Sequence, residues 1–267
     1  MPQPNQVPTD SFTPVIYKPV ADSHKIKMLV YGPPGVGKTT LAATADLHPL
    51  TKKVLFINVE GGMLSVSDMS RIGLKEAPDV TDMGTFDNLD KIFWFLAKGN
   101  HPYQTVCIDS LSELQMVNLE SIVEKQVGAT SRSGGKRESL DDIWQEDYGV
   151  STQQIRRLIR KFRDLPMHVI FTCLDRTDMD KQKNVFVGPA LTPKVATAAM
   201  GYMDIVAYMY ADSATDEDGQ TTYTRKLLCQ PYDRWIAKDR SPDGKLGMVI
   251  EDPSIPKIMN MIIGGTK

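Results

Sequence analysis

Short apolar segments separated by polar turns recur along this chain. Four of them have the length and bounding residues of buried strands, at 28–31, 53–60, 104–109 and 167–173. Apolar positions at helical spacing predict helices at 85–98, 111–127 and 151–165, the last opened by a capping box at 151–154. Strands that alternate with helices predict an α/β fold with a mainly parallel sheet flanked by helices.

The pattern changes toward the C-terminus. Segments 204–210 and 222–230 predict a β-hairpin, an antiparallel extension of the sheet edge, and 232–240 predicts a further strand. A short amphipathic helix is expected at 255–263. Five prolines within residues 1–24 favour an extended or disordered arm, so we expect an arm at 1–24 and one domain at 25–267.

A glycine-rich loop lies between the first strand and a helix predicted from residue 39. The spacing Gly32-x4-Gly37-Lys38-Thr39 meets the P-loop pattern in full, with the preceding strand and following helix that the pattern requires. A chance glycine-rich turn is the alternative, and Lys38 and Thr39 together argue strongly against it. The expected nucleotide-binding residues are Gly32, Pro33, Pro34, Gly35, Val36, Gly37, Lys38, Thr39 and Thr40.

These residue types suit Mg²⁺ and ATP. Glycines let successive backbone N–H groups form an anion-binding nest, and the following helix directs its positive dipole end at the same phosphates. Lys38 would supply a point charge to the β- and γ-phosphates, and the Thr39 hydroxyl would ligate Mg²⁺.

Two carboxylates follow apolar strands. Asp109 ends the third strand as in a Walker B motif and is the second expected Mg²⁺ ligand. Glu60 ends the second strand beside Gly61 and Gly62, at the sheet edge where α/β proteins bind ligands, so it is a candidate to orient or deprotonate the attacking water. A solvated strand-end charge is the alternative for Glu60.

Composition narrows the class of protein. Apolar residues make up 41% of the chain and charged residues 24%, which is ordinary for a soluble globular protein. The net charge of −2 gives no global attraction to nucleic acid, and three well-separated cysteines in apolar surroundings indicate reduced core thiols. No apolar run is long enough to span a bilayer and no signal-peptide pattern opens the chain, so a cytoplasmic protein is expected.

One region is locally basic. The loop 128–139 is small and polar, Trp144 and Tyr148 follow it, and the helix after them carries cations on its polar side. Such a patch suits a nucleic-acid backbone, with the two aromatic rings available to stack on bases. A solvated helix face explains the charges equally well. The expected DNA-binding residues are Arg132, Lys136 and Arg137 in the loop and Arg156, Arg157 and Arg160 in the helix. The polar stretch 175–193 is long for a connection and predicts a second functional loop.

In the order of its parts the chain resembles the RecA-like recombinase core, in particular the short phage-encoded RecA-like proteins grouped with single-strand annealing proteins. The resemblance rests on residues 32–39, 54–62, 105–110, 128–163 and 169–173. It implies a RecA-like P-loop ATPase that binds single-stranded DNA, promotes annealing or strand exchange in recombination, and works beside a single-strand DNA-binding protein in the host cytoplasm.

Site residues follow from the same resemblance. It implies that Glu60 is the catalytic base and that 128–148 and 175–192 contact DNA. It also implies a homo-oligomeric ring or filament in which Lys238 and Arg240 complete the catalytic site of a neighbouring subunit. An edge strand protected by charge is the alternative explanation of these cations. One departure is that Cys173 and Leu174 end the fourth strand, where the family has a polar pair.

Two other functions remain open. The loop is also close to that of AAA+ ATPases, which would make the protein a motor or loader in DNA replication or packaging, but Asp109 is followed by Ser110 where that family usually has Asp-Glu. A nucleotide-dependent scaffold without productive turnover is the other alternative.

Overall fold

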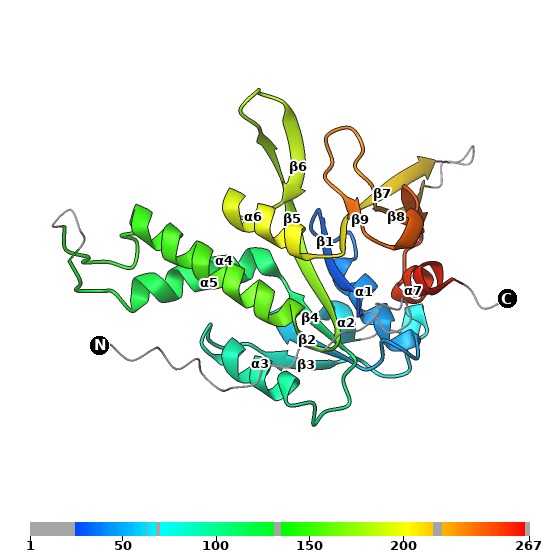
Figure 1. Ribbon diagram of the computed structural model, residues 1–267, viewed down its shortest axis with the longest axis horizontal. Helices are drawn as coiled ribbons and strands as arrows, with labels where there is room; N and C mark the ends of the chain where they lie inside the picture. Colours follow the sequence, from blue (N-terminus) through cyan, green and yellow to red (C-terminus); the bar gives the residue numbers. More distant parts are fainter. Residues whose placement is uncertain (1–24, 63, 68–69, 131–134, 216–220, 265–267) are drawn as a thin grey trace, which may run out of the picture.

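A mixed sheet of ten strands organises the described part of the chain, residues 25–62, 64–67, 70–130, 135–215 and 221–264 of a computed structural model (Figure 1). The strand order is β10-β8-β7-β1-β5-β4-β2-β3, with β6 paired to β5 and β9 paired to β7. The strands are β1 (Lys27–Gly32), β2 (Val54–Asn58), β3 (Asp79–Asp82), β4 (Thr105–Asp109), β5 (His168–Met179), β6 (Val185–Pro189), β7 (Ile205–Thr215), β8 (Thr221–Leu228), β9 (Lys238–Asp239) and β10 (Val249–Glu251).

The strands from β7 to β3 are parallel, and the strands added beyond them are antiparallel. β1 pairs with β5 and β7, β4 pairs with β5 and β2, and β2 pairs with β3, all in parallel. β8 runs antiparallel to β7, and β10 runs antiparallel to β8. The predicted α/β class, the mainly parallel sheet and the antiparallel extension on the C-terminal side are therefore confirmed. β5 separates β1 from β4, so the P-loop strand and the Asp109 strand do not pair directly.

Helices cover both faces of the sheet because side chains alternate along each strand. Leu29 and Tyr31 of β1 face one apolar cluster, and Met28 and Val30 face the other. The first cluster includes α3 (Asn88–Ala97), α4 (Leu111–Glu124), α5 (Gln145–Arg163) and α6 (Pro193–Tyr202). The second includes α1 (Lys38–Ala43), α2 (Leu64–Ser67) and α7 (Ile255–Ile263). None of the helices in the described ranges is long and apolar enough to cross a membrane.

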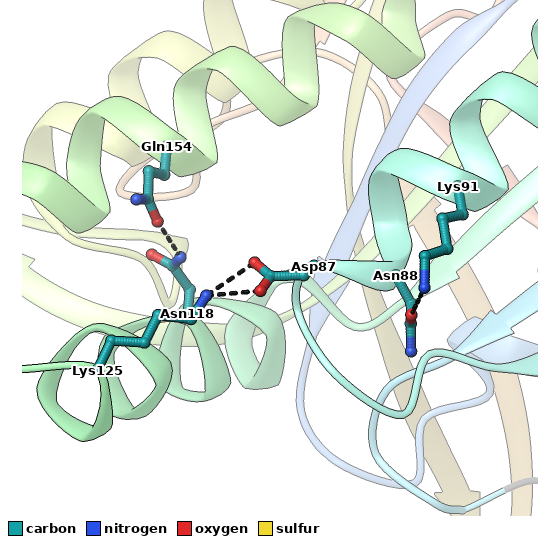
Figure 2. Close-up of polar contacts among 6 residues, drawn as sticks. All are labelled: Asp87, Asn88, Lys91, Asn118, Lys125 and Gln154. Carbon is teal, nitrogen blue, oxygen red and sulfur yellow. Dashed lines mark hydrogen bonds and ion pairs between the residues drawn. The ribbon is translucent and has the colours of Figure 1, made fainter.

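Polar contacts fix α4 against its neighbours (Figure 2). The Asn118 amide of α4 donates to the Gln154 side chain of α5 at 2.6 Å, and Lys125, after the end of α4, pairs with Asp87 before α3 at 2.7 Å. Asn118 is fully buried, so its amide needs a partner inside the protein. The α4–α5 pair is therefore joined by a specific polar bond as well as by apolar packing.

Several predicted boundaries were wrong. α5 begins at Gln145, six residues before the predicted capping box, because the Asp147 carboxylate accepts the Trp144 N–H at 2.7 Å and caps an earlier turn. The predicted strand at 232–240 reduces to β9. α6, β3 and β10 were not expected, whereas α7 spans the predicted residues 255–263.

The stretch 175–193 is also not a loop. β5 continues to Met179 and pairs antiparallel with β6, and Figure 1 shows the two strands projecting from the sheet as a ribbon. The hairpin predicted from 204–210 and 222–230 is present as β7–β8, but β7 also pairs with β1 and so belongs to the parallel core. The predicted arm, 1–24, lies outside the described residues.

Candidate nucleotide-binding site

The glycine loop leaves the sheet where β1 ends and enters α1 at Lys38. A Cβ on Gly32 would lie 2.2 Å from the Met209 carbonyl oxygen of β7, so the neighbouring strand excludes every side chain at that position. Gly37, which precedes α1, has a φ of 108°, a conformation that side chains strongly disfavour. Gly32 is therefore required because the β7 backbone lies too close for a side chain, and Gly37 is required because of its own backbone conformation.

Lys38 lies inside the loop and is 9% exposed. Its ammonium donates to the carbonyl oxygens of Gly32 and Pro33, each at 2.8 Å. Burial lowers the pKa of the Lys38 amine, and the nearby carboxylates of Asp109 and Glu60 act in the opposite direction. The amine thus lies against the start of the loop, within the field of two carboxylates.

Asp109 is buried at the end of β4, between two threonine hydroxyls. The Thr39 hydroxyl, in the first turn of α1, donates to one carboxylate oxygen at 2.6 Å. The Thr172 hydroxyl of β5 donates to the other oxygen. All three residues lie toward the carboxyl ends of parallel strands, where such sheets bind ligands. The sequence did not identify Thr172 as a site residue, because a single hydroxyl within an apolar strand was the only signal for it.

A hydroxyl and a carboxylate are the oxygen ligands that Mg²⁺ prefers. The Thr39–Asp109 pair therefore fits Mg²⁺ bound together with nucleotide phosphates. Within the described residues no group of three or more His, Cys, Asp or Glu side chains could hold a metal ion. Phosphate oxygens and water molecules would have to supply the remaining ligands.

Glu60 lies two residues beyond the end of β2 and is exposed. Its carboxylate accepts a hydrogen bond from the hydroxyl of Ser110, the residue that follows Asp109 and caps α4. Glu60 is also close enough to influence the Lys38 amine. The structure thus brings Lys38, Thr39, Asp109 and Glu60 to one end of the sheet. Their catalytic roles stay predictions.

Cys173, at the position of the family's polar pair, is fully buried, and burial raises the pKa of its thiol to about 12. Its sulfur lies 3.1 Å from the Ser112 hydroxyl of α4, which also accepts the Leu174 N–H at 3.0 Å. The Cys173 thiol and the Leu174 backbone amide therefore connect this part of β5 to α4 through the Ser112 hydroxyl.

Lys238 and Arg240 lie away from the P-loop of their own chain. β9 pairs with the first residues of β7, at the end of the parallel sheet opposite Gly32. The Lys238 amine donates to the Met200 carbonyl near the end of α6, and burial lowers its pKa to about 8. Arg240 is exposed. Their predicted action on a neighbouring subunit stays a prediction.

Three of the expected DNA-binding cations form an open surface on α5. The side chains of Arg156, Arg157 and Arg160 are exposed and make no hydrogen bond or ion pair within the described part of the chain. Further along the helix, Lys161 pairs with Asp90 at 2.8 Å and Arg163 pairs with Asp164 at 2.6 Å. Lys136 is exposed in the preceding loop, and Arg132 lies outside the described residues.

Arg137 was wrongly expected to contact DNA. Its side chain is fully buried, its guanidinium pairs with Asp147 at 2.7 Å, and it lies 4.1 Å from the centre of the Trp144 ring. Its backbone N–H also bonds to the Ala129 carbonyl, closing the base of the loop. Arg137 therefore anchors the loop to the start of α5, and its charge is neutralised inside the protein.

Comparisons with known proteins found similar solved structures and one matching family model. Similar solved structures include the assembled ATPase EscN of the type III secretion system of enteropathogenic E. coli, with 13% identity, a TM-score of 0.41, and coverage of 69% of this chain and 43% of that one. A prototypical ATPase from the type III secretion system of pathogenic bacteria has 12% identity, a TM-score of 0.42, and coverage of 69% and 51%. This chain thus spans about half the length of these two proteins.

No curated protein matches the sequence. The AAA domain family matches residues 24–241, a range that includes the P-loop, both candidate carboxylates, the basic surface of α5, and β9. The chain therefore belongs to the AAA domain family of P-loop ATPases.

Proposed function

We propose that this protein is a Mg²⁺-dependent ATPase of RecA-like type that binds single-stranded DNA and promotes annealing or strand exchange in phage homologous recombination. The observation that carries the proposal is the convergence of Lys38, Thr39, Asp109 and Glu60 at the carboxyl end of one sheet. Each residue has the chemistry that one part of phosphoryl transfer requires.

These residues divide the work as follows. Lys38 would exchange its two carbonyl contacts for phosphate oxygens, and Thr39 and Asp109 would hold Mg²⁺. When bound, this metal would supply positive charge to the phosphates. Glu60, held by the Ser110 hydroxyl, orients the attacking water and accepts its proton. Since Ser110 also caps α4, the water-orienting group is connected directly to the start of that helix.

The proposed DNA surface is the exposed face of α5 with Lys136. Arg156, Arg157 and Arg160 have no partners within the described residues, so phosphate groups could pair with them without breaking internal ion pairs. α4 starts at the ATP site and packs along α5, to which Asn118 bonds. This packed connection offers a route by which DNA binding could alter turnover.

We further propose that the protein assembles with itself, as a ring or filament, and that Lys238 and Arg240 act on nucleotide bound by the neighbour. Lys238→Ala would then bind nucleotide but hydrolyse it slowly. Mixing Lys238→Ala subunits with Lys38→Ala subunits should restore some turnover, because a mixed interface can pair an intact P-loop from one subunit with an intact Lys238 from the other. Mixed assemblies, verified by mass measurement, that stay as inactive as both parents would contradict this arrangement.

A motor or loader of AAA type, acting in DNA replication or packaging, is the second candidate. The family match favours it. The described residues after 204 form the strands β7 to β10, a short 3-10 helix (Pro242–Gly244) and one α-helix, α7, however, whereas AAA+ motors usually carry a helical lid.

Phosphate release with and without single-stranded DNA separates these functions. Stimulation by DNA, lost steeply as salt rises, together with faster annealing of complementary strands, is the result we expect. Turnover indifferent to DNA would favour the motor, and nucleotide binding without turnover would favour a scaffold. Lys38→Ala serves as the control for contaminating ATPases.

A further inference from the structure

The β7–β8 ribbon lies directly against the glycine loop, although its residues are far from the P-loop in sequence. Met209 of β7 approaches Gly32 through its carbonyl group, and its terminal methyl lies 3.5 Å from where a Gly37 Cβ would be. Arg225 of β8 makes the polar contact: its Nε donates to the Val36 carbonyl at 3.0 Å. Both ends of the loop are thus in contact with this ribbon.

The Arg225 contact constrains the direction of one loop amide. In a planar trans peptide the carbonyl and the following N–H point to opposite sides, so a Val36 carbonyl directed at Arg225 turns the Gly37 N–H away from the ribbon. Gly37 has no side chain to restrict this peptide, and a nest binds anions only when its N–H groups converge. An external hydrogen bond therefore supplies an orientation that the glycine itself cannot enforce.

We infer that Arg225 is a positioning residue for nucleotide binding, acting through the Val36–Gly37 peptide. The inference rests on the proposed function and extends it to a residue outside the P-loop motif. The strand register holds Arg225 in place, since it pairs with Ala211 and its carbonyl accepts the Asp252 N–H at 2.8 Å. The contact requires a donor at this position more than a positive charge.

The chain offers a matched control in the next residue. Lys226 is a cation on the same strand, but its amine pairs with Asp212 at 2.8 Å and Glu251 at 3.3 Å instead of with the loop. Lys226→Met should therefore leave nucleotide affinity unchanged. Arg225→Met keeps the apolar stem and removes the donor, whereas Arg225→Gln keeps a neutral donor and Arg225→Lys keeps the charge.

The experiment measures the affinity of the full chain for Mg²⁺ with a non-hydrolysable ATP analogue by calorimetry, and KM and kcat with ATP. Arg225→Met should weaken binding about tenfold, as expected for one hydrogen bond from a charged donor, and raise KM while kcat changes little. Arg225→Gln should restore most of the affinity. We expect KM to change more than kcat because the Arg225 donor acts on the loop and not on the reacting phosphate.

Three results would overturn the inference. Wild-type affinity in Arg225→Met would show that the contact is dispensable. Recovery by Arg225→Lys but not by Arg225→Gln would show that a neutral donor does not suffice and that the positive charge is required. This comparison remains decisive if the Met variant unfolds. A wild-type protein that binds no nucleotide would overturn the proposed function together with the inference, and so differs from a failure at Arg225 alone.

Discussion

Removing the negative charge that faces Arg137 should destabilise the loop before α5. The two side chains are 0% and 2% exposed, and their N–O distance is 2.7 Å. Asp147→Asn keeps nearly the same shape but removes the ion-pair partner of the buried guanidinium. Its Nε and Nη1 atoms have no hydrogen-bond partner among the described residues, so the guanidinium depends on Asp147.

The magnitude follows from burial. Breaking a buried ion pair by removing one partner costs about 3–5 kcal/mol, because the remaining charge has left water without compensation. The Trp144 ring, 4.1 Å from the guanidinium carbon, still attracts the cation and offsets roughly 1 kcal/mol. We therefore expect Asp147→Asn to lower the free energy of unfolding, or of local opening, by about 3 kcal/mol.

Urea unfolding measures the global effect, and hydrogen exchange across residues 128–150 detects opening of the loop alone. Asp87→Asn is the matched control: Asp87 pairs with Lys125 at the same 2.7 Å, but the two side chains are 67% and 58% exposed. An exposed pair should contribute no more than about 1 kcal/mol. Replacing both buried partners, as Arg137→Met with Asp147→Leu, should recover part of the loss.

A loss below about 1 kcal/mol in Asp147→Asn, with unchanged hydrogen exchange, would refute this reasoning. It would mean that water reaches the pair in solution. Arg137 would then regain its place among the cations available to a DNA backbone.

Three further outcomes are expected. Lys38→Ala should lose ATP binding, whereas Glu60→Gln should bind ATP and lose at least about a hundredfold in kcat, because a water-orienting carboxylate acts chiefly in the transition state; normal turnover in Glu60→Gln would remove the main support for a RecA-like mechanism. Arg156→Glu with Arg160→Glu should weaken single-stranded DNA binding and reduce its salt dependence, and unchanged affinity would return α5 to a solvated face. Burial lowers the pKa of His168 to about 3, so below about pH 6.5 only the unfolded chain takes up this proton, and stability should fall by roughly 1.4 kcal/mol per pH unit as the pH drops toward 3. Urea midpoints at pH 7 and 5 should differ more in the wild type than in His168→Gln, and equal differences would contradict the assignment.

Local sequence by itself determined the parts of this protein whose physics is local. The P-loop could be predicted because its glycines, Lys38 and Thr39 lie within eight residues and need only a strand before them and a helix after them. Asp109 could be predicted because an apolar strand that ends in a carboxylate has the same signature in isolation. The final helix, α7, was predicted to the residue because its apolar face repeats at helical spacing, and in the structure Ser254 caps it.

Only the tertiary structure decided which distant side chains meet. The order of the strands inserts β5 between β1 and β4, and this places Thr172 against Asp109; periodicity within a strand carries no information about its neighbours. For the same reason the sequence could not identify Arg225, whose hydrogen-bond partner lies 189 residues away in the chain. For Arg137 the charge was visible in the sequence, but its burial depends on a helix that starts earlier than its capping signals indicated. Charge is a property of a residue, whereas exposure and partners belong to the packed chain.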